Sequence, residues 1–382
     1  MLGINSNINS LVAQQNLNGS QSALSQAITR LSSGKRINSA ADDAAGLAIS
    51  TRMQTQINGL NQGVSNANDG VSMIQTASSA LSSLTSSLQR IRQLAVQAST
   101  GTLSSSDQAA LQQEVSAQIS EVNRIASQTT YNGTNILDGS AGNVTFQVGA
   151  NVGQTISLNL SQSMSAAKIG GGLVQTGQTV GTIAVSLDST GVYTSAASPA
   201  ITAVNVLSDG KGGYTFTDQN NQAIAATVAA AIFTTGTQAG TGTAITTLAL
   251  SAGATTTAGA GSAAQVAAVA QINAINNPPT VSNLNISTVT GANEAMVSID
   301  NALQTVNNLQ ASLGAAQNRF TAIATSQQAE STDLSSAQSQ ITDANFAQET
   351  ANLSKAQVLQ QAGISVLAQA NSNPQQVLKL LQ

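Results

Sequence analysis

Residues capable of chemistry are few in this chain, and the most reactive kinds are missing. Its 382 residues include no histidine and no cysteine, which removes the commonest general base, the commonest transition-metal ligand and all thiol chemistry. An adjacent acidic pair stands at Asp42 and Asp43. Neighbouring residues of a helix point apart and no third ligand is nearby, so a metal or acid–base role is disfavoured. We interpret Asp42 instead as the N-cap of the helix that follows.

The central region holds three more carboxylates, at Asp188, Asp209 and Asp218. A glycosidase-type pair in this region would have to come from them. Asp209 opens the turn sequence Asp-Gly-Lys-Gly-Gly, where solvation explains it better than catalysis does. A zinc protease of the H-E-x-x-H type is impossible without histidine. We therefore predict no catalytic residue, no cofactor and no metal site, and an enzyme in this region is the disfavoured alternative.

The composition limits the classes of partner. Only 7% of the residues are charged, 2% are aromatic and the net charge is −4, which is unlike a globular enzyme and argues against a nucleic-acid partner. The sequence contains no stretch of eighteen apolar residues, so no membrane span is predicted. The N-terminal residues lack the basic and apolar regions of a signal peptide, so we expect any export to leave the N-terminus uncleaved.

One long helix organises the chain. Apolar residues between Ala44 and Ala98 recur at alternating steps of three and four, which places them on one side of a helix that packs as a coiled coil. At about 1.5 Å per residue this helix is roughly 80 Å long, so its seam needs long partner helices. The seam residues that we expect to be buried include Ile74, Leu81, Leu84, Leu88 and Ile91.

The same spacing returns after Asn293 and predicts the partner helix, which runs to about Ile341. Gln327 and Glu330 interrupt its seam. The residues that we expect on this second seam include Leu303, Val306, Leu313 and Phe320.

Shorter elements fill the remainder. A helix over 105–129 begins with a capping-box candidate at Ser105 and Gln108. Alternating apolar residues predict a β-hairpin over 143–160 and a second hairpin on either side of residues 209–213. Residues 262–276 are consistent with a short helix before Pro278 and Pro279. The region 176–285 is rich in Gly, Thr and Ala and is predicted to be a β-rich insertion.

Both ends of the chain are poor in charge. Residues 1–33 carry weak apolar stripes, so we expect this segment to be disordered in the monomer and helical when packed against copies of itself. Residues 343–382 mirror it, with apolar residues spaced by four at Val358, Ala362, Val366 and Ala370. The N-terminal and C-terminal segments therefore pair with each other.

The predicted fold is mainly α, with long paired coiled-coil helices from both chain ends, a β-hairpin and a β-rich central insertion domain. We expect three domains. Residues 1–42 with 343–382 form a terminal helical assembly domain, 43–175 with 286–342 form a helical rod domain with the hairpin, and 176–285 form a variable, surface-exposed insertion.

Several long stretches resemble the bacterial flagellins. At the N-terminal side they are INSNINSLVAQQNLN, ITRLSSGKRINSAADDAAGLAIS (28–50), LQRIRQLAVQAS (88–99), TTYNGTNILDG (129–139) and FQVGAN (146–151). At the C-terminal side they are SIDNALQTVNNLQASLGAAQNRF (298–320), ITDANFAQETANLSKAQVLQQAGISVLAQAN (341–371) and the final VLKLLQ. The resemblance covers about 1–175 and 287–382, and residues 176–285 lie where the family varies.

The resemblance implies a structural protein that self-assembles into the helical flagellar filament used for motility. It implies secretion through the type III flagellar apparatus to an extracellular filament, with the terminal helices lining the inner tube. It implies as partners many copies of the chain itself, the flagellar cap, hook-associated junction proteins and a cytoplasmic export chaperone on the C-terminal segment.

The resemblance also implies recognition by innate immune receptors. The positions that match the patch read by Toll-like receptor 5 are Arg90, Leu94 and Gln97, with Glu114 opposite, and we expect them to be exposed in a monomer and buried between protofilaments. Since Leu94 lies off the coiled-coil seam, we expect it to face outward. Plant recognition uses the stretch matching Arg30–Thr51, in which Arg30, Asp43 and Gly46 fit the pattern.

Two further alternatives stay open on the residues. A hook–filament junction protein would share the terminal pattern loosely but keep less of the 88–99 and 129–151 motifs. A coiled-coil adhesin would use the insertion as a binding head, and an insertion could also add adhesion to a filament role.

Overall fold

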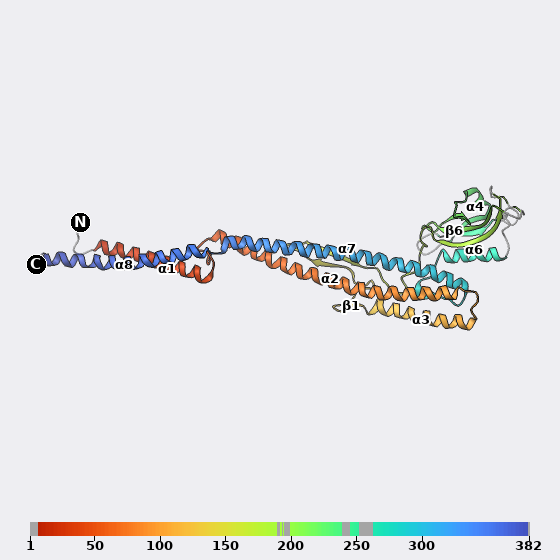
Figure 1. The fold of residues 1–382 in the computed structure, drawn as a ribbon, viewed down its shortest axis with the longest axis horizontal. Coiled ribbons are helices and arrows are strands. Elements are labelled where there is room, and N and C mark those ends of the chain that lie inside the picture. Colours follow the sequence, from red (N-terminus) through yellow and green to blue (C-terminus); the bar gives the residue numbers. More distant parts are fainter. Residues whose placement is uncertain are drawn as a thin grey trace. The chain divides into compact units, whose positions relative to one another are not determined.

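The computed structural model describes residues 7–188, 192, 194, 199–238, 245–251 and 263–380. The fold is mainly helical, with long helices from both chain ends, a β-hairpin and a β-rich insertion, which confirms the predicted class (Figure 1). The chain divides into two compact units. The first consists of Met1–Asn68, Gln147–Thr155 and Thr321–Gln382, and the second of Asp69–Phe146 and Ile156–Phe320.

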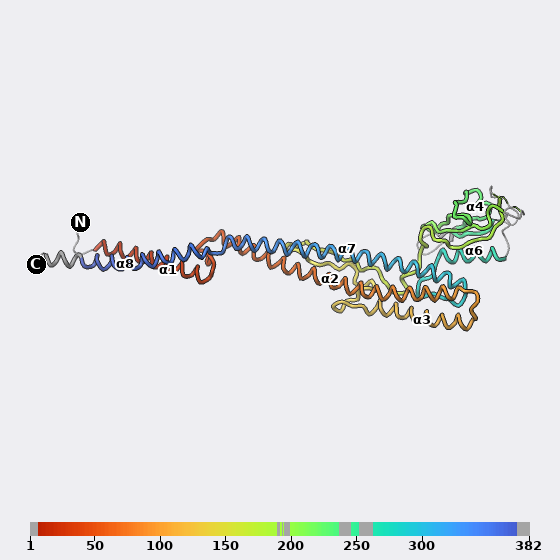
Figure 2. Tube along the Cα trace, viewed as in Figure 1, coloured from red at the N-terminus to blue at the C-terminus, as the bar shows by residue number. Residues whose placement is uncertain are grey.

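In the first unit, helix α1 (Ile8–Ser33) lies antiparallel to helix α8 (Phe346–Leu380), as the trace in Figure 2 shows. The Asn7 side chain donates to the Ala370 carbonyl at 2.7 Å at one end, and Arg30 contacts Glu349 at the other. We expected α1 to need other copies in order to fold. That expectation is wrong for this structure, because α8 of the same chain supplies the packing partner.

The seams between α1 and α8 combine leucines with small and polar residues at alternating steps of three and four. Ser10, Ala13, Leu17, Ser20, Leu24 and Ala27 on α1 are buried or half-buried, and so are Leu353, Ala356, Gln360, Gly363, Leu367 and Ala370 on α8. The predicted spacing by fours is therefore only partly right. Ala370 is buried, but Val358 and Val366 are 64% and 57% exposed, because they lie on another side of α8.

The parts of helices α2 (Ala44–Ala98) and α7 (Val289–Thr342) in the first unit bury apolar residues such as Ile57 and Leu60 and also meet through polar side chains. Ser331 donates to Asn61 Oδ1 at 2.9 Å, and Gln338 Nε2 donates to the Ser50 carbonyl at 3.0 Å. Gln327, which interrupts the predicted seam, is buried and donates to the Val148 carbonyl. The 147–155 loop lies against α2 here, and a Cβ on Gly63 would meet this same carbonyl oxygen.

In the second unit the seam between α2 and α7 is dry and apolar. Ile74, Leu81, Leu84, Leu88 and Ile91 have no exposed surface, which confirms the prediction for α2. On α7, buried residues recur regularly at Ile299, Ala302, Val306, Leu309, Leu313, Ala316 and Phe320.

Leu303 is only half-buried, so its predicted place on the seam is wrong. The step of four that precedes Val306 selects Ala302, and Leu303 lies one residue to the side. Phe320 packs edge-on against Phe146, with ring centroids 5.3 Å apart.

Helix α3 (Ser105–Gln128) follows α2 and leads to two small hairpins, β1 (Thr130–Tyr131) with β2 (Thr134–Asn135) and β3 (Gly142–Gln147) with β4 (Thr155–Leu160). The predicted helix and the 143–160 hairpin are confirmed. The capping box is one residue earlier than predicted, because Ser104 caps the helix and Asp107 reaches back to the Ser104 backbone N–H at 3.2 Å.

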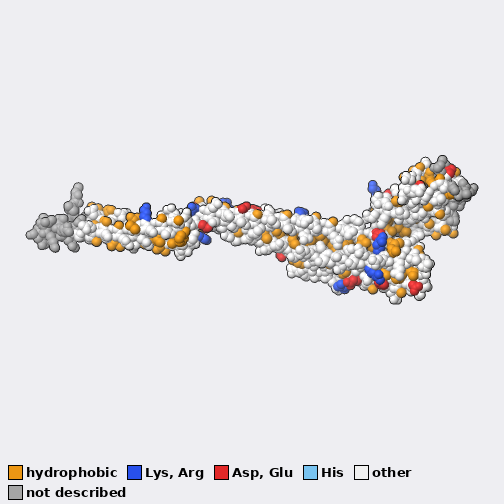
Figure 3. All heavy atoms as spheres, viewed as in Figure 1, with side chains coloured by type: hydrophobic (Ala, Val, Ile, Leu, Met, Phe, Trp, Pro, Cys, Tyr) orange, Lys and Arg blue, Asp and Glu red, His pale blue; other side chains and the backbone are white. Residues whose placement is uncertain are grey.

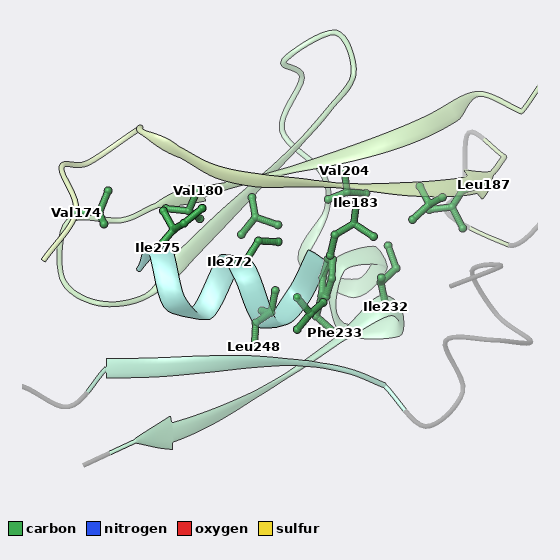
Figure 4. Packing of buried hydrophobic residues seen from close by; sticks show 13 residues of the cluster. Val174, Val180, Ile183, Leu187, Val204, Ile232, Phe233, Leu248, Ile272 and Ile275 are labelled. Carbon is green, nitrogen blue, oxygen red and sulfur yellow. The ribbon is translucent and has the colours of Figure 1, made fainter. Parts of the chain in front are cut away.

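The insertion has its own core, in which helix α6 (Ala263–Ile275) lies between a three-stranded sheet and a hairpin (Figure 4). The sheet is antiparallel and has the order β5 (Thr179–Leu187), β6 (Ile201–Ser208) and β7 (Tyr214–Asp218), with the predicted hairpin formed by β6 and β7.

Ile272 and Ile275 of α6 face Val180, Ile183 and Val204 of the sheet, and Leu248 covers the other side. The remaining bounds are α4 (Ala226–Ile232), β8 (Phe233–Gln238), β9 (Ile245–Leu250) and a 3-10 turn η1 (Val281–Asn283).

Tyr214 makes the insertion sensitive to alkaline pH. Burial raises the pKa of its hydroxyl from 10.0 to about 12, and the hydroxyl donates to Asn273 Oδ1 at 3.0 Å. The unfolded chain loses this proton near pH 10 while the folded chain keeps it, so stability falls between pH 10 and pH 12. We expect Tyr214→Phe to reduce this loss in thermal melts recorded across that range. A wild-type and a variant curve that fall in parallel would contradict the assignment.

Candidate assembly and recognition surfaces

Large apolar side chains face outward along both terminal helices. The seam takes up only some of the large apolar residues, so others remain exposed, and Figure 3 shows apolar side chains along this pair on the face drawn. Exposed fractions of 48% to 72% belong to Ile8, Leu11, Val12 and Ile28 of α1 and to Phe346, Val358, Leu359, Ile364 and Val366 of α8. These nine residues are called the outward stripes below. Exposed apolar surface of this kind marks an interaction site.

The segment 34–43 between α1 and α2, called the joint from here on, explains the positions of three of the predicted recognition residues. Arg30 Nη1 lies 3.2 Å from Glu349 Oε1, and its Nη2 lies 3.8 Å from Asp42 Oδ1. Asp43, not Asp42, caps α2, since its carboxylate accepts from the Gly46 backbone N–H at 2.9 Å. Gly46 is buried, and a Cβ there would meet the Ile37 side chain at 2.7 Å.

The predicted N-cap role of Asp42 is therefore wrong. Its carboxylate accepts from the backbone N–H groups of Asn38 and Ser39, and from Gln26, so it closes the turn before the helix. These hydrogen bonds lower the pKa of Asp42 below its ordinary value, the Gln26 side chain having the largest effect.

The second recognition set lies in the other unit, on α2 and α3. Arg90 and Glu114 come together in an ion pair whose Nε–Oε1 distance is 2.8 Å, and both side chains are over one-third exposed. Gln97 is also exposed, two helical turns beyond Arg90.

The expectation that Leu94 faces outward is wrong, because only 1% of it is exposed. Helix α3 folds back beside α2 and the Arg90–Glu114 pair joins the two, so α2 buries a second stripe next to its coiled-coil seam.

The carboxylates of the insertion each hold a local turn. Asp209 accepts from the N–H groups of Lys211 and Gly213, Asp218 from those of Asn220 and Gln222, and Asp188 from that of Val192. In the part of the chain that the structure describes, no three potential metal ligands come together. None of the described helices is long and apolar enough to cross a bilayer.

Comparisons with known proteins decide the family. The description "Bacterial flagellin N-terminal helical region" matches residues 4–142, "Flagellin, D2 domain" matches 172–277, and "Bacterial flagellin C-terminal helical region" matches 296–381. The chain belongs to the bacterial flagellin family. Flagellin B of Vibrio cholerae is 37% identical over 392 residues, covering 100% of this chain and 99% of the relative.

Two further comparisons agree. B-type flagellin of Pseudomonas aeruginosa is 35% identical over 487 residues, covering 100% of both chains. The solved structure of FliC from Burkholderia pseudomallei is 67% identical with a TM-score of 0.58, covering 66% of this chain and 100% of that one. As a flagellin, the chain is a structural subunit of the bacterial flagellar filament, an extracellular assembly, and its family is not an enzyme family.

Sequence reasoning missed one member of the joint, Glu349. Its side chain is 9% exposed and pairs with Arg30 across 319 residues of sequence. The available signal was that a single acidic residue stands in a segment of otherwise uncharged residues, from Ala344 to Ser354.

Proposed function

We propose that this flagellin self-assembles by burying the outward stripes of α1 and α8 against other copies of the chain. The carrying observation is that both terminal helices, when paired with each other, still leave the nine large apolar residues of the outward stripes in solvent. Burying this surface is favourable by about 25 cal/mol per Å² before the costs of association. The charge-poor composition of both helices supports the same reading.

Substitution of the α8 stripe tests this proposal. We expect the double variant Val358→Ser/Val366→Ser to lower seeded polymerisation at least about tenfold, because each hydroxyl would be buried without a partner between copies. Filament length by electron microscopy and the sedimented fraction are the measurements. The matched control is Ser354→Ala/Ser365→Ala, which changes exposed polar positions of the same helix. Normal filaments from the valine variant would overturn the proposal.

The predicted domain limits are part of the same proposal. We propose that residues 1–42 with 343–382 are the assembly domain, that 43–175 with 286–342 are the rod, and that 176–285 face outward as the variable insertion. Type III export, an export chaperone on the C-terminal segment, and contacts with the cap and junction proteins belong to this proposal through the family.

Recognition by innate receptors remains part of the proposal in a narrower form. A receptor that binds the monomer can contact the exposed surface of Arg90, Gln97 and Glu114. Leu94 is buried and would act by packing under α2. Of the three named residues of the plant-type stretch only Asp43 is exposed, and Arg30 and Gly46 act through the shape of the joint.

A further inference from the structure

The pairing of α1 with α8 contains little that sets its register. The α8 seam repeats itself, since a shift of fourteen residues places Leu353 on Leu367 and Ala356 on Ala370. A shift of seven exchanges Ala356 for Gly363 on one row of the seam and Leu353 for Gln360 on the other. Packing alone therefore distinguishes alignments fourteen residues apart weakly, and alignments seven residues apart only by the exchange of leucine for glutamine and of alanine for glycine.

One charged contact is different. Arg30 is the only charged residue of α1. Its side chain forms an ion pair with Glu349, whose side chain is 9% exposed. In a helix pair shifted by seven residues, Ala356 would take the place of Glu349 and the guanidinium would lose its partner in a partly buried site. A buried charge without a partner is strongly unfavourable, and a buried polar pair is a known way to fix register.

Arg30 is also tied to the segment before α2. Its Nη2 lies 3.8 Å from Asp42 Oδ1, and Asp42 is held in turn by the N–H groups of Asn38 and Ser39. We propose that Arg30, held between Glu349 and Asp42, is the positioning residue that fixes the register of α1 on α8. It would thereby set which outward residues stand side by side on the two helices.

A competing explanation is the joint itself. The Arg36 N–H donates to the Thr342 carbonyl at 2.6 Å, and the Ala344 N–H donates to the Gly34 carbonyl at 2.9 Å, so the backbone already ties the chain near these helix ends. If these bonds alone set the register, removing the ion pair would leave the alignment unchanged. The test must therefore read the alignment and not the stability.

The absence of cysteine allows a direct reading by disulfide formation. A Cβ on Gly363 would lie 3.8 Å from Leu17 Cβ, which is the separation that a disulfide requires. The reporter Leu17→Cys/Gly363→Cys therefore reads the native register. The reporters Leu17→Cys/Ala370→Cys and Leu17→Cys/Ala356→Cys read shifts of seven residues in the two directions. Oxidation is performed on the full, unpolymerised chain. Trimethylamine oxide is added because this osmolyte favours burial of protein surface and so favours pairing of the two helices.

We expect the native reporter to cross-link in preference to both shifted reporters, and Arg30→Met/Glu349→Leu to lower that preference at least about threefold. This double variant places apolar side chains at both positions, so the helices can still pack against each other although the ion pair is gone. Arg52→Gln, at an exposed charge on α2, is the matched control and should leave the preference unchanged.

An unchanged preference in the double variant would overturn the proposal and assign the register to the joint. Equal cross-linking of all reporters in the parent chain would overturn it as well. Neither result depends on polymerisation, so a failure here is distinguishable from a failure of the outward stripes to drive assembly.

Discussion

Leu88→Asp is expected to abolish the cooperative thermal unfolding transition of the α2–α7 pair. Leu88 has no exposed surface and lies in the seam between Leu84 and Ile91, which are equally buried. A carboxylate there would have to be desolvated or protonated with no partner nearby, a loss of at least about 4 kcal/mol. Because the packing of these long helices stabilises them, losing the seam should also lower their helix content.

Far-ultraviolet circular dichroism during heating is the measurement for this variant. The matched control is Gln89→Asp, which places the same charge at the next residue, on the exposed side of α2. We expect the control to stay within about 0.5 kcal/mol of the parent chain. A soluble Leu88→Asp chain that melts like the control would refute the dry seam.

Gly63→Ala should destabilise the first unit by about 2–4 kcal/mol, an unusual cost for one methyl group. The Cβ would lie well inside the contact distance of the Val148 carbonyl oxygen and 2.9 Å from Gln327 Oε1. The carbonyl is backbone of the 147–155 loop and accepts from Gln327, so it cannot move aside without breaking that bond.

A helical glycine elsewhere in the chain provides the control. Gly314 of α7 has nothing within 4 Å of an added Cβ, so Gly314→Ala should be stabilising by roughly 0.5–1 kcal/mol through helix propensity alone. Urea titrations of the two variants measure the difference. If Gly63→Ala behaved like Gly314→Ala, the loop would not lie closely on α2.

Periodicity predicted the residues of the α2 seam correctly. Ile74 through Ile91 were predicted because a 3.5-residue repeat is a property of the local sequence. It misplaced Leu94 and Val358, since α2 and α8 each carry two apolar stripes and the sequence alone does not tell which stripe faces the chain's own partner.

Boundaries and long-range pairs were the other limits. Asp42 and Asp43 offer the same cap chemistry one residue apart, and only the path of the joint decides between them. The Arg30–Glu349 pair joins residues 319 apart, a distance over which local pattern carries no information. Arg90 and Glu114 were placed together by family resemblance, and the ion pair supplies the physical contact.

The two kinds of seam between α2 and α7 imply a direction of opening. Near the joint the buried residues include Ser50, Gln327 and Ser331 beside Ile57 and Leu60, and the hydrogen bonds of the three polar residues can be exchanged for bonds to water at a small net cost. Beyond Phe320 toward Ile299 the seam is apolar, and separation there would wet a dry surface. Local fraying should therefore occur more readily in the mixed seam of the first unit than in the apolar seam of the second. A chain in which the two helices begin to separate should therefore keep the apolar part of the seam closed longest.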